Sequence, residues 1–382
     1  MGCLNSKESR ASKYAVSGGN DDDANIAEAL PGSSPAKAPS SEVTPAAKET
    51  ATGKIKNLPR PRLDPKDFQL VGCKGEVKVK LPGSINGQAY VIDKCEDCDI
   101  YVLDYCAQVT IDECKGCRIY IGPTDGAVFV RDCSGCSLAV VSRQLRTRDC
   151  HDCRISLHCR TKPVVESSTN VGFACFDLPY PELADHMRQA KLGLFHNFWW
   201  HVYDFTPKPG NWQLLPPDVT AASLLQPLPQ EVAERFVMTP GKEGQQEESS
   251  GSKQESPVLM TFGNRQPRPD GRSYLFVAFE GGKSEKALQL ARSASEKGWL
   301  LHTNEVRLGP EAAAALAAEA GWSKAAGKAL SGGGKAACVG LELAVPEGEE
   351  VAALRARVKA LGGQCSDSEA AGKSFRTQGV DG

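Results

Sequence analysis

Cysteine pairs are the residues whose type and spacing most directly permit chemistry in this chain. The pattern Cys-x-x-Cys occurs four times between residues 89 and 159, at Cys95/Cys98, Cys114/Cys117, Cys133/Cys136 and Cys150/Cys153. Thiolates separated by two intervening positions can chelate a tetrahedral zinc ion, so a zinc module is one interpretation. The other is that the cysteines are small buried side chains at the corners of a repeating fold.

The segments around these pairs repeat as well. The pairs recur at a nearly constant interval, and apolar residues recur with them in two columns: Ile100, Ile119, Leu138 and Ile155, then Val102, Ile121, Val140 and Leu157. A period of about 19 residues with short alternating runs is typical of a solenoid, in which each coil stacks on the previous one. Zinc binding does not require such columns. We therefore interpret the cysteines as reduced and stacked in a core, with no metal.

The alternation within each run assigns side chains to the inside or the outside of the solenoid. The predicted inward columns are Tyr90, Val109, Val128 and Leu145, then Ile92, Ile111, Val130 and Thr147. Gln144, Arg146 and Arg148 are predicted to point outward, and the earlier coils have Val91, Thr110 and Phe129 in the column of Arg146. An outward arginine is ordinarily a solvated charge. Glu166, which follows Arg146 by about one coil, is predicted to hold its guanidinium by paired hydrogen bonds.

The N-terminus carries a second chemical signal. Gly2 follows the initiator Met, and Ser6 stands four positions later, which is the pattern for N-myristoylation. One myristoyl chain binds a bilayer only marginally, so palmitoylation of Cys3 would supply the second anchor. Attraction to anionic lipid would come from the basic residues Lys7, Arg10 and Lys13. The alternative is a coincidental Gly-Cys start in a disordered tail.

Composition and charge bound the remaining possibilities. The chain has 382 residues and a formal net charge of −2, so its overall electrostatics give no reason to expect nucleic acid as a partner. Its apolar runs are too short to cross a bilayer. Polar, Pro-rich and Gly-rich stretches predict five parts: a disordered tether over 1–63, a solenoid domain with a C-terminal extension over 64–238, a linker over 239–270, an α/β domain over 271–363 and a disordered tail over 364–382.

The second domain shows alternating strand and helix patterns. Strands are predicted over 273–279, 299–303 and 337–343, and helices over 284–297, 312–320 and 351–361. This order favours a small ferredoxin-like α/β fold. It resembles nucleoside diphosphate kinase, but His302 lies inside a predicted strand and lacks the Asn-x-x-His context of the phosphohistidine, so we expect no kinase activity.

The outward arginine lies in a run that resembles a known family. The segments Gln144-Leu-Arg-Thr-Arg-Asp-Cys150, Pro163-Val-Val-Glu-Ser-Ser168 and Phe173-Ala-Cys-Phe176 are similar to the tubulin-cofactor-C domain, from about Asp64 to Pro216. That resemblance implies a right-handed parallel β-helix. With the acylation signal and the α/β domain, the chain resembles the membrane-anchored, GTPase-activating members of the family.

The resemblance also implies a function. In such members the Gln-x-Arg motif, here Gln144 and Arg146, stimulates GTP hydrolysis by an Arf-like small GTPase, with Arg146 as an arginine finger and Glu166 and Arg148 in support. GTP and magnesium would belong to the GTP-loaded partner, so no cofactor is expected in this chain. The implied location is the cytoplasmic face of the plasma membrane, a cilium or a basal body, in the trafficking of lipidated cargo. The alternatives are a tubulin-folding cofactor acting on tubulin GTP and a non-catalytic membrane scaffold.

Overall fold

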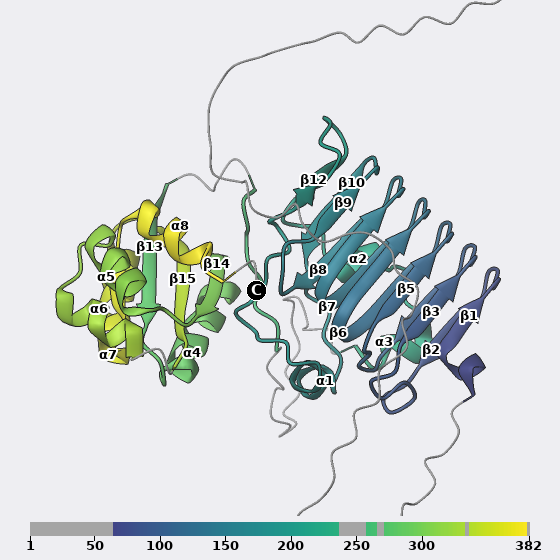
Figure 1. Ribbon diagram of the computed structural model, residues 1–382, viewed down its shortest axis with the longest axis horizontal. Coiled ribbons are helices and arrows are strands. Elements are labelled where there is room, and N and C mark those ends of the chain that lie inside the picture. The colour runs from purple at the N-terminus through teal and green to yellow at the C-terminus, as the bar shows by residue number, and fades with distance from the viewer. Residues whose placement is uncertain (1–63, 237–256, 266–270, 333–335, 380–382) are drawn as a thin grey trace, which may run out of the picture. The chain divides into compact units, whose positions relative to one another are not determined.

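The computed structural model describes residues 64–236, 257–265, 271–332 and 336–379 (Figure 1). The predicted tether over 1–63, with Gly2 and Cys3, lies outside the described residues. Within the described part no helix is long and apolar enough to span a membrane. By their contacts, Arg62–Gly382 form one unit.

Parallel strands stacked coil on coil form the first domain (Figure 1). One side of the solenoid consists of β1 (Gln69–Val71), β3 (Tyr90–Asp93), β5 (Val109–Asp112), the second halves of β6 (Arg118–Arg131) and β7 (Ser137–Arg148), β9 (Val164–Glu166) and β11 (Tyr203–Asp204). The other side consists of β2 (Val77–Lys80), β4 (Asp99–Val102), the first halves of β6 and β7, β8 (Arg154–Cys159), β10 (Val171–Cys175) and β12 (Trp212–Leu214). The predicted parallel β-helix is confirmed.

The register matches the columns predicted from the sequence. Tyr90 pairs with Val109, Val109 with Val128 and Val128 with Leu145, and all four are buried. The cysteines of the four pairs are also buried in the same core, and every cysteine in the described residues is free. Their thiols donate to backbone carbonyls, as Cys117 Sγ does to the oxygens of Cys95 and Lys115. The prediction that the pairs stack in a core is confirmed.

Backbone geometry explains which residues separate the cysteines of each pair. The second intervening residue has a positive φ in every coil: 52° at Asp97, 61° at Gly116, 63° at Gly135 and 54° at Asp152. Glycine adopts this left-handed conformation without steric cost, and aspartate tolerates it better than most residues. The Cys-x-x-Cys spacing is therefore the signature of a tight corner between two strands.

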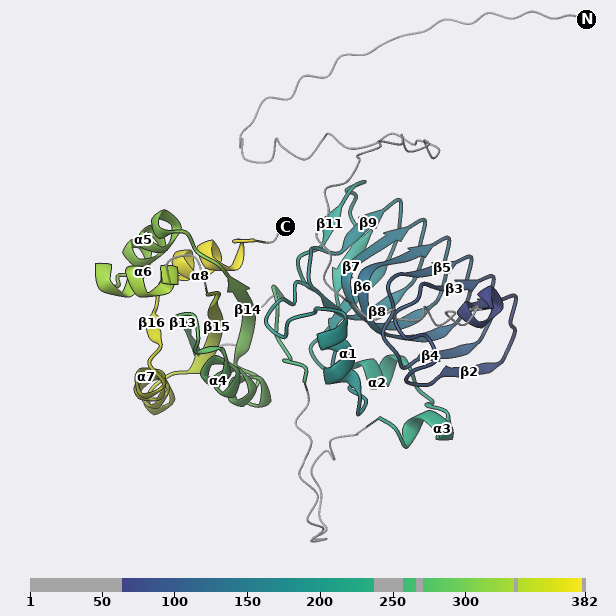
Figure 2. The same ribbon diagram turned by 60° about the horizontal axis from the view of Figure 1, so that its bottom comes forward.

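Short helices cover one outer face of the solenoid (Figure 2). The helices on this face, α1 (Leu183–Gln189), α2 (Ala221–Leu224) and α3 (Gln230–Ala233), follow the coils. The one-turn helix η1 (Pro65–Phe68) precedes β1, and its Phe68 packs against the solenoid core. Apolar residues of this extension pack on the outward aromatic side chains Tyr101 and Tyr120. That face is consequently closed, whereas the face formed by β3, β5, β7 and β9 carries no helix from the described part of the chain.

The second domain is a four-stranded antiparallel sheet with helices on both faces. Its strands β13 (Arg272–Phe279), β14 (Leu300–Val306), β15 (Cys338–Pro346) and β16 (Gln364–Ser366) follow the order β14-β15-β13-β16. Helices α4 (Ser284–Glu296) and α7 (Glu349–Leu361) pack on one face. The other face carries α5 (Pro310–Glu319), α6 (Lys324–Ser331) and α8 (Glu369–Arg376) (Figure 2). The predicted small α/β fold is confirmed.

Two predicted boundaries are wrong. Residues 364–379, expected in a disordered tail, form β16 and α8, because β16 pairs with β13 and Phe375 is buried under the sheet. Residues 257–265, expected in the linker, are ordered as well: Leu259 and Thr261 are buried, and the amide of Phe262 donates to the carbonyl of Leu300 at 2.8 Å. Both segments are short and adjoin polar stretches, so only their tertiary contacts identify them.

Candidate functional site

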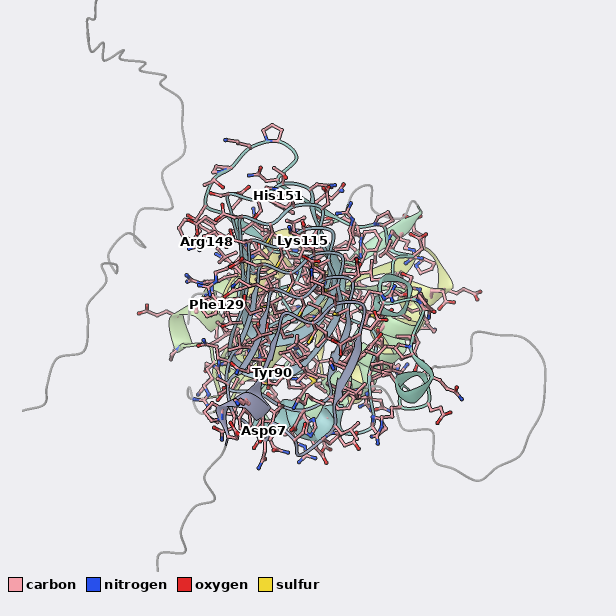
Figure 3. All side chains as sticks on the ribbon, turned by 90° about the vertical axis from the view of Figure 1, so that its right-hand side faces the viewer. Asp67, Tyr90, Lys115, Phe129, Arg148 and His151 are labelled. Carbon is pink, nitrogen blue, oxygen red and sulfur yellow. The ribbon has the colours of Figure 1, made fainter. Side chains whose placement is uncertain are left out.

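Arg146 lies where the sequence places it, on the outer surface of the solenoid. It is exposed on β7, and its register neighbours are Phe129 on β6 and Val164 on β9. Phe129 pairs in turn with Thr110, and Thr110 with Val91. Figure 3 shows Phe129 and Arg148 on one side of the solenoid, with Lys115 and His151 at a corner. The column predicted from periodicity is therefore the real outward row.

Other arginines of the solenoid are fixed by an aspartate from the preceding coil. Arg118 donates Nε to Asp99 Oδ1 at 2.5 Å and Nη2 to Asp99 Oδ2 at 2.7 Å. Arg131 makes the same paired contact with Asp112, at 2.7 and 2.6 Å, and Arg143 donates to the carboxylate of Asp125. Such bidentate pairs fix the guanidinium and neutralise its charge locally.

Arg146 differs from these three arginines. Among the residues that the structure describes, no carboxylate or carbonyl oxygen accepts a hydrogen bond from its side chain, because its column contains a phenyl ring and a valine at the adjacent coils. All five guanidinium donors are thus available to an external acceptor. A planar fork of donors next to apolar side chains is suited to several oxygens of one phosphate group.

The predicted bond between Glu166 and Arg146 is not present. In the register of β7 and β9, Arg146 pairs with Val164, and Glu166 pairs with Arg148. The sequence separation used for the prediction is therefore slightly longer than this coil. Glu166 is exposed on the same face, diagonal to Arg146, and the Arg148 guanidinium lies 3.3 Å from the Asp149 carboxylate.

Gln144 lies on the same strand and the same face as Arg146. It is half-buried and pairs in register with Ala127 on β6. Since alternate side chains on a strand point the same way, Gln144 and Arg146 present an amide and a guanidinium side by side. The structure therefore brings Gln144, Arg146 and Arg148 together on one strand, with Glu166 on its neighbour.

Two exposed aromatic residues border this row and were missed by the sequence analysis. Tyr203 and Phe205 are 51% and 56% exposed, and their rings form an edge-to-face pair with centroids 4.9 Å apart. Tyr203 pairs with Val164, which pairs with Arg146, so Tyr203 lies two strands, or about 10 Å, from the arginine row. Large exposed aromatic side chains beside an arginine are typical of a protein-binding surface. A run of alternating aromatics, Tyr-x-Phe, was the available signal.

The cysteine pairs show no arrangement for binding a metal. In the described residues no group of three or more His, Cys, Asp or Glu side chains is placed to hold an ion. In the first pair, burial raises the pKa of the Cys95 thiol to about 11 and also raises the pKa of Cys98, so these two thiols favour the protonated form over the thiolate that zinc requires. The predicted site residues that the structure describes, Gln144, Arg146, Arg148 and Glu166, all lie on the outward row, and Gly2 and Cys3 lie outside the described residues.

The coils match a known sequence family. The family described as "Tubulin binding cofactor C" matches residues 87–205, which include every coil from β3 to β11. A solved structure, "Tubulin Binding Cofactor C from Leishmania major", is 18% identical and covers 36% of this chain and 85% of that one, with a TM-score of 0.24.

Curated relatives are similar over more of the chain. "Protein XRP2" from Danio rerio is 46% identical over 257 residues, which are 66% of this chain and 65% of the relative. "Protein XRP2" from Homo sapiens is 43% identical over 256 residues, 66% of this chain and 70% of the relative. The matched part thus spans about two thirds of the length of these relatives. The resemblance seen in the sequence is thereby confirmed at the level of the family. This chain belongs to the XRP2 family.

Proposed function

We propose that this chain is a GTPase-activating protein for an Arf-like small GTPase and supplies Arg146 to the partner's active site. The observation that carries the proposal is the contrast between Arg146, which has no acceptor among the described residues, and Arg118, Arg131 and Arg143, which are each bound to an aspartate. A surface arginine without a carboxylate acceptor in the described part of the chain, two strands from exposed aromatics, fits insertion into an acidic pocket of another protein.

Chemically, the guanidinium of Arg146 would neutralise charge that develops between the β- and γ-phosphates during hydrolysis. An arginine supplied in this way accelerates GTP hydrolysis by about 10³- to 10⁵-fold. GTP and magnesium belong to the partner, so this chain alone should hydrolyse nothing. Gln144 would contact the phosphates or the partner's switch region, and Glu166 and Arg148 would form polar contacts at the edge.

The aromatic pair extends the proposed interface. Tyr203 and Phe205 give large contact area at low conformational cost, since each ring has only two side-chain torsions. The helix-covered opposite face has its aromatics Tyr101 and Tyr120 buried, so in the described part of the chain it offers no comparable pair. The partner would therefore bind across β7, β9 and β11.

Membrane attachment is part of the proposal. Gly2 would be myristoylated and Cys3 palmitoylated, which places the chain on the cytoplasmic face of the plasma membrane, at a cilium or at a basal body. There, GTP hydrolysis by the partner would end a cycle that releases lipidated cargo. We expect no kinase activity from the α/β domain, because His302 is 2% exposed and contacts Glu342 and Trp200.

A single-turnover assay tests the proposal. Purified Arf-like GTPases loaded with GTP are mixed with the wild-type chain or with Arg146→Ala, and phosphate release is measured. Stimulation by the wild type that the variant lacks supports the proposal, whereas equal stimulation by both contradicts it. GTP-bound tubulin is a second substrate in the same assay, because the matching family description names tubulin. Stimulation of tubulin alone would favour a tubulin cofactor, and no stimulation of either would favour a scaffold.

A further inference from the structure

The α/β domain contains a polar cluster between β13, β14, β15 and α8, formed by the buried His302 and Glu342 and the half-buried Tyr274 and Arg376. Glu342 is 4% exposed, and its carboxylate accepts a hydrogen bond from the Tyr274 hydroxyl at 2.8 Å. His302 Nδ1 and Arg376 Nε each lie 3.4 Å from Glu342 Oε1, and Arg376 Nη1 lies 2.8 Å from His302 Nδ1. Opposite charges stabilise the ionised carboxylate, and accordingly the pKa of Glu342 lies below its usual range in spite of burial.

Trp200, from the segment that follows the solenoid coils, packs on this cluster. Its ring meets that of His302 edge-on, with centroids 4.4 Å apart, and the Arg376 guanidinium carbon lies 5.3 Å from the Trp200 ring centroid. The same indole belongs to the apolar core of the solenoid. A hydrogen bond from a side chain to the backbone also joins the two segments: the Thr303 hydroxyl donates to the carbonyl of Phe195 at 2.8 Å.

The chain continues from Trp200 directly into β11, the strand that carries Tyr203. This strand is very short, and it adds to the sheet through ladder bonds from Tyr203 N to Pro163 O at 2.9 Å and from Phe205 N to Val165 O at 2.8 Å. So short an edge strand frays unless its ends are fixed. On the C-terminal side Asp204 accepts from Thr206 N and Asn211 Nδ2, both at 2.9 Å. On the N-terminal side Val202 packs against the solenoid core, the His201 amide donates to the carbonyl of Phe198 at 2.9 Å, and Trp200 contacts the α/β domain.

We propose that Arg376 and Trp200 are positioning residues for the solenoid surface: the polar cluster fixes Trp200, Trp200 fixes β11, and β11 presents Tyr203 and Phe205 two strands from Arg146, on the same face. The α/β domain would thereby hold β11 in place on the partner-binding face, a role that we call the brace. The proposal rests on the proposed function for its kinetic consequence, but its structural consequence can be measured without any partner.

The test compares Arg376→Gln with Arg376→Lys and with the matched control Arg357→Gln, an exposed arginine of α7 that donates to Ser293 Oγ. Hydrogen exchange is followed at the amides of Tyr203 and Phe205 in the full chain. Arg376→Gln is expected to speed exchange there about tenfold, with partial rescue in Arg376→Lys and no change in Arg357→Gln. In the hydrolysis assay, the KM for the GTP-loaded GTPase should rise severalfold with kcat unchanged, because Arg376 touches no reacting atom.

Two results would overturn the brace. One is unchanged exchange at Tyr203 and Phe205 in Arg376→Gln while circular dichroism shows the α/β domain folded. The other is an equal loss of kcat and kcat/KM, which places Arg376 in the chemistry. If the wild-type chain stimulates no GTPase, the proposed function is wrong. The hydrogen-exchange measurement then still tests whether Arg376 and Trp200 position β11.

Discussion

Arg146 and Phe129 are register partners on adjacent parallel strands, so the residue beside the arginine on the preceding coil is a phenyl ring. Further along the same strands, Arg148 pairs with Arg131, and Arg131 is bound to the Asp112 carboxylate. Arg131 therefore has a carboxylate partner on the preceding coil, whereas Arg146 has a phenyl ring at the equivalent position.

Arg146→Lys should lose most of the stimulation of GTP hydrolysis, by about 10³-fold or more, because an ammonium offers one point charge where the guanidinium offers a planar fork. Single-turnover phosphate release measures the effect. The control is Arg118→Lys, on the other side of the solenoid and paired with Asp99, which should retain stimulation. A lysine variant that stimulates normally would show that Arg146 is not the finger.

Tyr203→Ala and Phe205→Ala should each weaken binding of the GTP-loaded partner by about tenfold and leave kcat unchanged, because the rings supply contact area and no charge to the phosphates. Isothermal titration with the GTPase bound to a non-hydrolysable analogue checks this. Val71→Ala, another exposed apolar residue, sits on the first coil away from Arg146 and should have no effect. Unchanged affinity in both aromatic variants would exclude β11 from the interface.

Chelation should leave the thermal unfolding temperature unchanged, since the stacked thiols are buried and paired with backbone carbonyls. Differential scanning calorimetry with and without a zinc chelator tests this, together with elemental analysis of the reduced protein. Cys136→Ala should nonetheless lower the unfolding free energy by about 1 to 3 kcal/mol, because it leaves a small cavity in the column. Stoichiometric zinc in the reduced protein would contradict our interpretation of the cysteines.

The free energy of unfolding should decrease as the pH is lowered from about 6.5 to about 4, because of His158. This histidine is 1% exposed and lies on β8. Burial lowers the pKa of its imidazole to about 4, below the 6.5 of an exposed histidine. The neutral ring is therefore favoured in the folded state, and this contribution, about 3 kcal/mol, is complete above pH 6.5 and lost as the pH approaches 4.

The measurement for His158 is urea unfolding of wild type and His158→Gln at pH values of about 7.5 and about 4.5, which bracket most of that window. The variant should lose less free energy of unfolding over that interval than the wild type. The exposed His151, which bonds to the Thr169 hydroxyl at 2.8 Å, provides the matched control His151→Gln. Equal losses in wild type and His158→Gln would assign the acid sensitivity to other groups.

Membrane binding should depend on the first residues of the chain. Gly2→Ala should abolish sedimentation with membranes after expression in cultured cells, because it removes the acceptor of the myristoyl group. Cys3→Ser should reduce it to the weak binding of a single chain, with an association constant of about 10⁴ M⁻¹. Full retention of Gly2→Ala on membranes would refute lipid anchoring at this terminus.

The repeat itself was determined by the sequence. Identical positions of successive coils meet in a parallel stack, so a period in the sequence becomes a column in space, and the columns of Leu145 and of Arg146 were both predicted correctly. The strand and helix order of the α/β domain followed from local periodicity in the same way. The short elements α6, β16 and α8 carry too few residues for such a pattern, and they were not predicted.

Only the tertiary structure decided how the site is completed. The register of the last coils depends on loop lengths that vary from coil to coil, so Glu166 lies beside Arg148 instead of Arg146. Tyr203 lies near the arginine row because β11, a strand much later in the sequence, pairs with β9. Trp200 contacts Arg376, which belongs to the last helix of the α/β domain. Contacts between such distant segments leave no local pattern, because they arise from shape and burial after the coils have stacked.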